Sequence, residues 1–250
     1  MTPLEYATAI RSDTDRLIEA ARLIGFDEPV PTCPGWRVRE VSLHLGKVHR
    51  WATRYVVERL AQMVDEESET AMISSGPDDS ELLAWLRQGA SELAAALEAA
   101  DPELRCWTFL PADSPRAFWA RRQAHETAIH RADLELAAGR LEPFASEFAA
   151  DGIDEILMGF AYRGRRHNRA PVGMEVVLRA IDHPVSWRLS VGPDGMTIGT
   201  GSANGDCLVT ATASDLYLLL WNRGDSRQLQ ADGDPAILSW WREHFKITWG

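Results

Sequence analysis

The 250-residue sequence predicts a two-domain α+β fold: an N-terminal four-helix bundle, then a smaller domain built on an antiparallel sheet. Two observations predict it. Apolar residues recur every three or four positions through the first half, which is typical of amphipathic helices. From Gly173 onward the apolar period shortens toward two, which is typical of half-buried strands. We place the boundary so that the domains cover residues 1–145 and 146–250.

Four long helices are predicted in the first domain. Each shows a continuous apolar stripe and ends at a glycine, a proline or a polar break. Their lengths and moderate connections favour a bundle. The expected helices span residues 3–24, 37–65, 80–100 and 116–138.

The second domain mixes the two periodicities. Pro193-Asp194-Gly195 is a hairpin signal between two of its expected strands. We therefore expect a small antiparallel sheet that carries helices. The expected helices span residues 145–162, 214–221 and 234–245, and the expected strands span residues 174–180, 185–191, 196–198 and 207–211.

Charge and composition exclude several classes of protein. A formal net charge of −11 argues against a nucleic-acid partner, because such proteins neutralise phosphates with clustered Lys and Arg. No stretch approaches the ~20 apolar residues of a membrane span, and the first residues do not look like an export signal. The three cysteines lie far apart without a CxxC pair, which indicates reduced thiols. We expect a cytoplasmic protein that binds neither nucleic acid nor a membrane.

The histidines concentrate in two helical segments. Glu126 and His130 are four residues apart, so both side chains project from one helical face. On the second helix, His44 and His49 each share a face with apolar residues, and spacing does not choose between them. Burying such groups without partners is unfavourable, and coordination of a divalent metal ion removes that penalty. A surface ion pair between Glu126 and His130 is the alternative that spacing leaves open.

Three segments resemble one family. Residues 30–40 read VPTCPGWRVRE and precede His44-Leu45-Gly46, which is similar to the opening of the mycothiol-dependent maleylpyruvate isomerase family. Residues 119–133, which contain the segment HETAIH, resemble that family's metal-binding helix. Residues 218–223 and the later Gly233-Asp234 resemble its second domain. The likeness covers nearly the whole chain in the right order.

The resemblance implies a fold and a set of site residues. It implies a DinB-like four-helix bundle followed by a domain similar to sterol carrier proteins. A zinc ion is then held by His44, Glu126 and His130, which match the family's ligand positions. The second domain contributes an arginine to the active site, and Arg223 matches that position as the candidate catalytic residue.

Three neighbouring polar residues each allow more than one interpretation. His125 is either a group behind the ligands or a hydrogen-bonded core residue, and we favour the core. Asp133, one turn beyond His130, either orients that imidazole or pairs with a nearby arginine. Cys33 has no base beside it in the sequence, so we interpret it as a small loop residue rather than a nucleophile.

The implied reaction is cis–trans isomerisation of maleylpyruvate with mycothiol as the thiol cosubstrate. Zinc in such a site lowers the pKa of a bound thiol, and Arg223 would bind a substrate carboxylate. Two other functions stay open, namely transfer of mycothiol to an electrophile or xenobiotic, and a non-catalytic metal-binding or sensor role. A His/His/Glu set would also accept nickel or another divalent ion.

Overall fold

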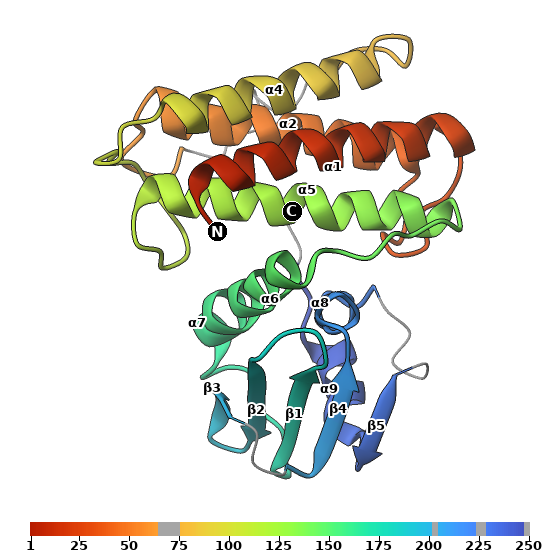
Figure 1. The fold of residues 1–250 in the computed structure, drawn as a ribbon, viewed down its shortest axis with the longest axis vertical. Coiled ribbons are helices and arrows are strands. Elements are labelled where there is room, and N and C mark those ends of the chain that lie inside the picture. Colours follow the sequence, from red (N-terminus) through yellow and green to blue (C-terminus); the bar gives the residue numbers. More distant parts are fainter. Residues whose placement is uncertain (65–75, 202–204, 224–228, 248–250) are drawn as a thin grey trace. The chain divides into compact units, whose positions relative to one another are not determined.

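The chain divides into two compact units, Met1–Glu142 and Pro143–Gly250, each described here by itself (Figure 1). In this computed structural model, residues 1–64, 76–201, 205–223 and 229–247 are described. The first unit is helical and the second combines helices with a five-stranded sheet. The two-domain α+β prediction is therefore confirmed.

The first unit is a four-helix bundle. α1 and α2 each pack against both α4 and α5, so the four helices close a ring around one core. The capping box of Thr2 and Glu5 starts α1, and the Ser114 side chain caps α5. Among the described helices, none is long and apolar enough to cross a membrane. The bundle helices are α1 (Pro3–Ile24), α2 (Val38–Val57), α4 (Leu82–Ala99) and α5 (Pro115–Ala137).

α2 is shorter than the sequence predicts. It ends at Val57 rather than near residue 65, and residue 65 itself lies outside the described residues. Arg59 has a φ of 54°, in the left-handed region where a right-handed helix cannot continue. The apolar stripe did not reveal this change of backbone direction.

α5 is the most enclosed helix of the bundle. From Phe118 to Glu135 every residue except Arg121 is buried, including acidic, basic and imidazole side chains. Buried polar groups need partners inside the protein, so this helix must carry a network of paired side chains. Both Glu126 and His130 lie in this stretch.

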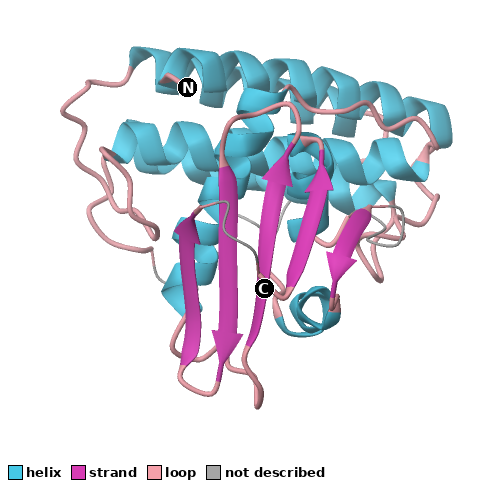
Figure 2. Ribbon diagram, turned by 60° about the horizontal axis from the view of Figure 1, so that its bottom comes forward, coloured by secondary structure: helices cyan, strands magenta, loops and turns pink. Residues whose placement is uncertain are grey.

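The second unit is built on one sheet with the strand order β3-β2-β1-β4-β5 (Figure 2). A helical segment precedes the sheet and includes a π-helical stretch, η1. Its strands are β1 (Met174–Ala180), β2 (Ser186–Gly192), β3 (Gly195–Thr200), β4 (Cys207–Ala211) and β5 (Gln230–Gly233). Its helices are α6 (Ser146–Asp154), η1 (Glu155–Ala161), α7 (Tyr162–Gly164), α8 (Ala213–Leu220) and α9 (Ala236–His244).

The sheet is mixed rather than wholly antiparallel, which corrects the prediction. β1 and β4 run parallel, with Val176 opposite Cys207, while the other neighbouring pairs are antiparallel. Apolar alternation reports which face of a strand is buried but not its direction. β5 was also not predicted, because all four of its residues are exposed and show no alternation.

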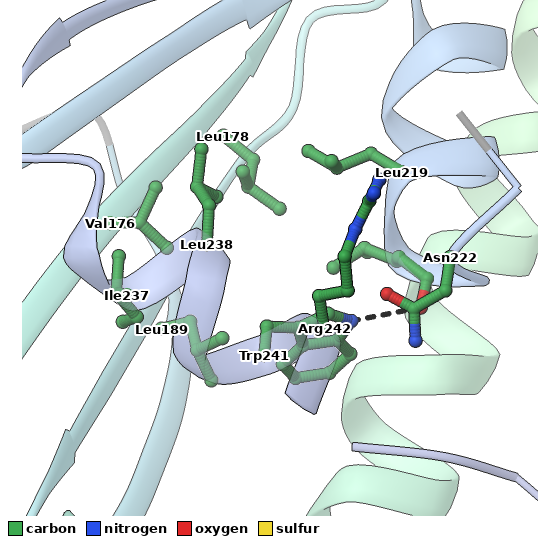
Figure 3. A pocket seen from close by; sticks show the side chains of 10 residues that line it. Val176, Leu178, Leu189, Leu219, Asn222, Ile237, Leu238, Trp241 and Arg242 are labelled. Atoms are coloured by element: carbon green, nitrogen blue, oxygen red, sulfur yellow. Dashed lines mark hydrogen bonds between the residues drawn. The ribbon is translucent and has the colours of Figure 1, made fainter. Parts of the chain in front are cut away.

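The core of the second unit lies where α8 and α9 pack against β1. Val176 and Leu178 of the sheet face Trp241 of α9 around a small pocket (Figure 3). Trp241 Nε1 donates a hydrogen bond to the Leu220 carbonyl oxygen at 2.9 Å. The free volume is about 10 Å³, room for about one water molecule, so this is packed core rather than a ligand site.

Candidate metal centre

Two helices of the bundle bring three potential ligands to one point. His44 Nε2, from α2, lies 3.2 Å from Glu126 Oε1, and His130 Nε2 lies 3.3 Å from the same oxygen. One ligand atom from each residue lies within 4.8 Å of the other two. A tetrahedral ion with bonds of about 2.0–2.1 Å separates its ligand atoms by roughly 3.3 Å. The two imidazoles and the carboxylate therefore fit a single small divalent ion. We call His44, Glu126 and His130 the metal cluster.

His49 lies outside the metal cluster. It follows His44 by five residues, which places the two side chains about 140° apart around the helix. His49 Nε2 lies 2.9 Å from Thr127 Oγ1, and that hydroxyl donates to the Gln123 carbonyl oxygen. The imidazole therefore donates to Thr127. Burial lowers the pKa of His49 to about 3, so this histidine is a neutral core residue.

Glu126 is held as a carboxylate despite its burial. Burial by itself would raise its pKa, but hydrogen bonds with His130 and His44 and the charge of Arg122 hold the pKa well below the usual range. Arg122 Nη2 donates to Glu126 Oε2 at 3.0 Å. The arginine thus occupies one carboxylate oxygen and leaves the other facing both imidazoles.

His130 is held from both ring nitrogens. Burial would lower its pKa, but hydrogen bonds with Asp133, Cys33 and Glu126 raise the pKa well above the usual range. Its Nδ1 donates to Asp133 Oδ2 at 2.9 Å. A metal ion at Nε2 would replace the proton there while Nδ1–H keeps its hydrogen bond to Asp133, an arrangement common for metal-bound histidine.

The loop before α2 covers one side of the metal cluster. The half-buried Trp36 ring lies 4.9 Å from the His44 ring and 6.3 Å from the His130 ring, between centroids. Cys33 Sγ lies 3.1 Å from Asp133 Oδ2. The interpretation of Cys33 as a small loop residue is therefore incomplete, because its thiol contacts Asp133, the carboxylate that is hydrogen-bonded to His130.

Comparison with known proteins places the chain in a family. The family described as "Mycothiol maleylpyruvate isomerase N-terminal domain" matches residues 7–135, and "MDMPI C-terminal domain" matches residues 147–239. The chain belongs to the mycothiol maleylpyruvate isomerase family. The family prediction is confirmed.

Solved structures agree with this family at the level of the fold. A crystal structure of the mycothiol-dependent maleylpyruvate isomerase superposes with a TM-score of 0.64 at 14% identity, covering 93% of each chain. A histidine-to-alanine mutant of that enzyme gives the same TM-score and coverage at 13% identity. A search of curated protein sequences found no significant match. At this identity the structural likeness shows the shared fold and not the substrate.

Two further residues were singled out in the sequence, His125 and Arg223. His125 lies outside the metal cluster, and the role of Arg223 is untested. His125 is fully buried, with its ring 6.2 Å from that of Tyr6, in keeping with a core role. Arg223 follows α8 in the second unit, and its Nη1 donates to the Trp221 carbonyl oxygen at 2.8 Å. Its role toward a substrate stays a prediction.

Sequence reasoning did not assign three residues to the surroundings of the cluster. Arg122 could have been found, because its i,i+4 spacing to Glu126 on α5 is a standard helix pair. Cys33 and Trp36 were noted in the loop motif, but a loop has no periodicity from which side-chain direction can be read. Only the folded chain shows that both side chains reach the histidines or their partner.

Proposed function

We propose that this family member is a mycothiol-using, metal-dependent enzyme in which His44, Glu126 and His130 hold one divalent ion. The observation that supports it is the approach of two imidazole Nε2 atoms to one oxygen of a buried carboxylate. Nitrogen and oxygen donors in this number suit zinc, our preferred metal, and also nickel. The bound ion would stabilise a thiol as its thiolate and polarise a substrate carbonyl.

The residues around the ligands have separate tasks. Arg122 adds to the effect of the two histidines in keeping Glu126 ionised, and its hydrogen bond to Oε2 leaves Oε1 facing the histidines. Asp133 accepts from His130 Nδ1 and so directs Nε2 toward the cluster. Trp36 packs beside the imidazole rings of His44 and His130 on one side. Together these contacts pre-organise the site before a thiol enters.

Isomerisation of maleylpyruvate is the reaction we favour. The thiolate adds to the cis double bond, the resulting single bond rotates, and elimination gives the trans isomer and returns the thiol. Arg223 is our candidate to bind a substrate carboxylate, because its planar fork can donate two parallel hydrogen bonds. Family membership supports this choice of reaction and of Arg223.

The test is identification of the product. Purified, metal-loaded protein is incubated with mycothiol and maleylpyruvate. The products are separated by liquid chromatography, and their masses are measured by mass spectrometry. We expect a product of unchanged mass that co-elutes with fumarylpyruvate, with mycothiol regenerated, and no product after the metal is removed by a chelator. Accumulation of a mycothiol adduct would instead indicate a transferase. An undiminished rate in metal-free protein would contradict the metal-dependent proposal.

Arg223 is examined in the same assay. Replacing it with Ala removes a charge-assisted hydrogen bond and should lower kcat/KM about 10–100-fold while metal content stays unchanged. Arg223→Lys keeps the charge without the fork and should fall between Arg223→Ala and wild type. Equal kinetics for all three proteins would exclude a role in substrate binding.

A further inference from the structure

We propose that Cys33 is a positioning residue of the metal cluster, acting through Asp133 on His130. The inference rests on the metal site proposed above and adds to it a residue from outside the two ligand-bearing helices. The half-buried thiol contacts Asp133 and also the His130 imidazole itself.

The first step is the shared oxygen of Asp133. This carboxylate is fully buried, and its Oδ2 lies 2.9 Å from His130 Nδ1 and 3.1 Å from Cys33 Sγ. Both neighbours donate to the same oxygen, from α5 itself and from the loop before α2. A buried carboxylate is costly unless hydrogen bonds satisfy it. The two donors together define where Oδ2 lies, and the position of Oδ2 defines the plane of the His130 ring.

The second step is the rigidity of the loop. The Val30 amide donates to the Trp36 carbonyl oxygen at 3.0 Å, and the Trp36 amide donates to the Cys33 carbonyl oxygen at 2.9 Å. The Cys33 amide donates to the Val30 carbonyl oxygen, also at 2.9 Å. An isolated bridge between Pro29 and Arg37 closes the loop at its base. The thiol is therefore presented to Asp133 from a fixed backbone.

The alternative role for Cys33 is direct coordination of the metal ion. Ligand atoms of Cys33, His130 and Asp133 also lie within 4.8 Å of one another. A tetrahedral zinc ion with a sulfur bond of about 2.3 Å and an oxygen bond of about 2.1 Å would separate those two atoms by roughly 3.6 Å. The observed 3.1 Å between Cys33 Sγ and Asp133 Oδ2 is shorter and suits a thiol hydrogen bond. The geometry favours positioning.

Zinc affinity of the otherwise intact protein tests the proposal, measured by competition with a chromophoric chelator. Asp133→Asn should weaken binding about 10–100-fold, and Cys33→Ala should weaken it less, about 3–10-fold. Cys33→Ser restores a hydroxyl donor and should bind within about twofold of wild type. Cys106→Ala, at the other half-buried cysteine of the first unit, is the matched control and should bind as wild type.

A spectroscopic readout separates positioning from ligation. With cobalt in place of zinc, the wild type should show no thiolate-to-cobalt charge-transfer band. A band that disappears in Cys33→Ala would overturn the proposal by making Cys33 a ligand. Circular dichroism confirms folding, and Cys33→Val, of similar size but without a donor, replaces Cys33→Ala if that variant unfolds.

The outcomes distinguish this inference from the proposed function. If wild type binds zinc and Cys33→Ala binds it equally well, the positioning role fails and the metal cluster stands. If serine does not rescue the alanine defect, the thiol does not act as a hydrogen-bond donor, and the inference fails as well. If wild type binds no zinc or cobalt, both proposals fail together.

Discussion

Two clusters of polar side chains share α5, and their charges are arranged in different ways. The metal cluster joins α5 to α2 and places two imidazoles on one carboxylate oxygen. The second cluster, which we call the charge network, joins α5 to α1. In it, each guanidinium group lies between carboxylates. Arg131 Nη1 lies 3.4 Å from Asp13 Oδ1, and Arg16 Nη2 lies 2.7 Å from Glu135 Oε1. The charge network consists of Asp13, Arg16, Arg131, Glu135 and Glu142.

This difference in arrangement supports a structural role for the charge network and the proposed ligand-binding role for the metal cluster. Within the charge network, two guanidinium groups face three carboxylates, so each charged side chain has a partner of opposite sign within the protein. In the metal cluster, two nitrogen donors of one kind turn toward a single anionic oxygen, which is how a protein arranges ligands for a cation. His130 and Arg131 are sequence neighbours, yet each belongs to a different cluster.

The largest effect is expected at Glu126. Glu126→Gln removes the anionic ligand and should lower zinc affinity more than about 100-fold, which is more than the usual loss when a residue that only hydrogen-bonds to a ligand is replaced. Competition with a chelator measures it. Glu135→Gln, an equivalent change in the charge network on the same helix, is the control and should keep wild-type affinity. Equal losses in both variants would show that the two clusters are not functionally distinct.

Arg131 should affect stability rather than metal binding. Arg131→Met leaves Asp13 without its nearest cation and Glu135 with Arg16 alone, and we expect the free energy of unfolding to fall by about 3–5 kcal/mol. Urea denaturation measures this change, and metal analysis of the folded variant should give the wild-type content. Loss of metal from the folded variant would contradict the separation of the two clusters.

The charge network should also set a pH dependence. Burial raises the pKa of Asp13 to about 6, although Arg131 and Arg16 oppose the shift. The folded pKa lies above the unfolded value, so the stabilisation is complete below about pH 4 and is lost as the pH rises through 6. The loss should approach about 3 kcal/mol. Urea midpoints of wild type and Asp13→Asn between pH 4 and 7 should diverge in favour of the variant as the pH rises. Parallel curves would contradict this assignment.

The smallest effect is expected at an exposed ion pair of the same bundle. Arg11 of α1 pairs with Glu98 of α4, with side chains 37% and 36% exposed. Water and salt weaken such pairs, so Arg11→Ala should change the unfolding free energy by less than about 1 kcal/mol. The urea experiment used for Arg131→Met provides the measurement. A loss of unfolding free energy as large as that in Arg131→Met would contradict the expectation that buried ion pairs contribute more to stability than exposed ones.

The helical half and the shared face of Glu126 and His130 could be predicted because both follow helix periodicity. The i,i+4 spacing of Glu126 and His130 places them on one face of any α-helix that contains them. The predicted bounds of α1 agree with the structure, and β1 and β4 also lie where alternation places them. These features depend on the spacing of residues within one helix or strand, which can be read from the sequence.

The remaining features depend on contacts that local patterns do not encode. Both His44 and His49 lie on partly apolar faces, and only the packing of α2 against α5 turns His49 to Thr127. Cys33 reaches Asp133 across about a hundred residues of sequence from a loop. The parallel pairing of β1 with β4 likewise depends on how the chain returns across the sheet.

The most direct test of the metal cluster is the metal content of purified protein, compared among wild type, His130→Ala and His125→Ala. His125 is the matched control because it is a buried histidine of α5 outside the cluster. We expect about one zinc ion per chain in wild type and in His125→Ala, and almost none in His130→Ala. A wild type that cannot be loaded with any divalent metal, or a His130→Ala variant that retains its full content, would contradict the account.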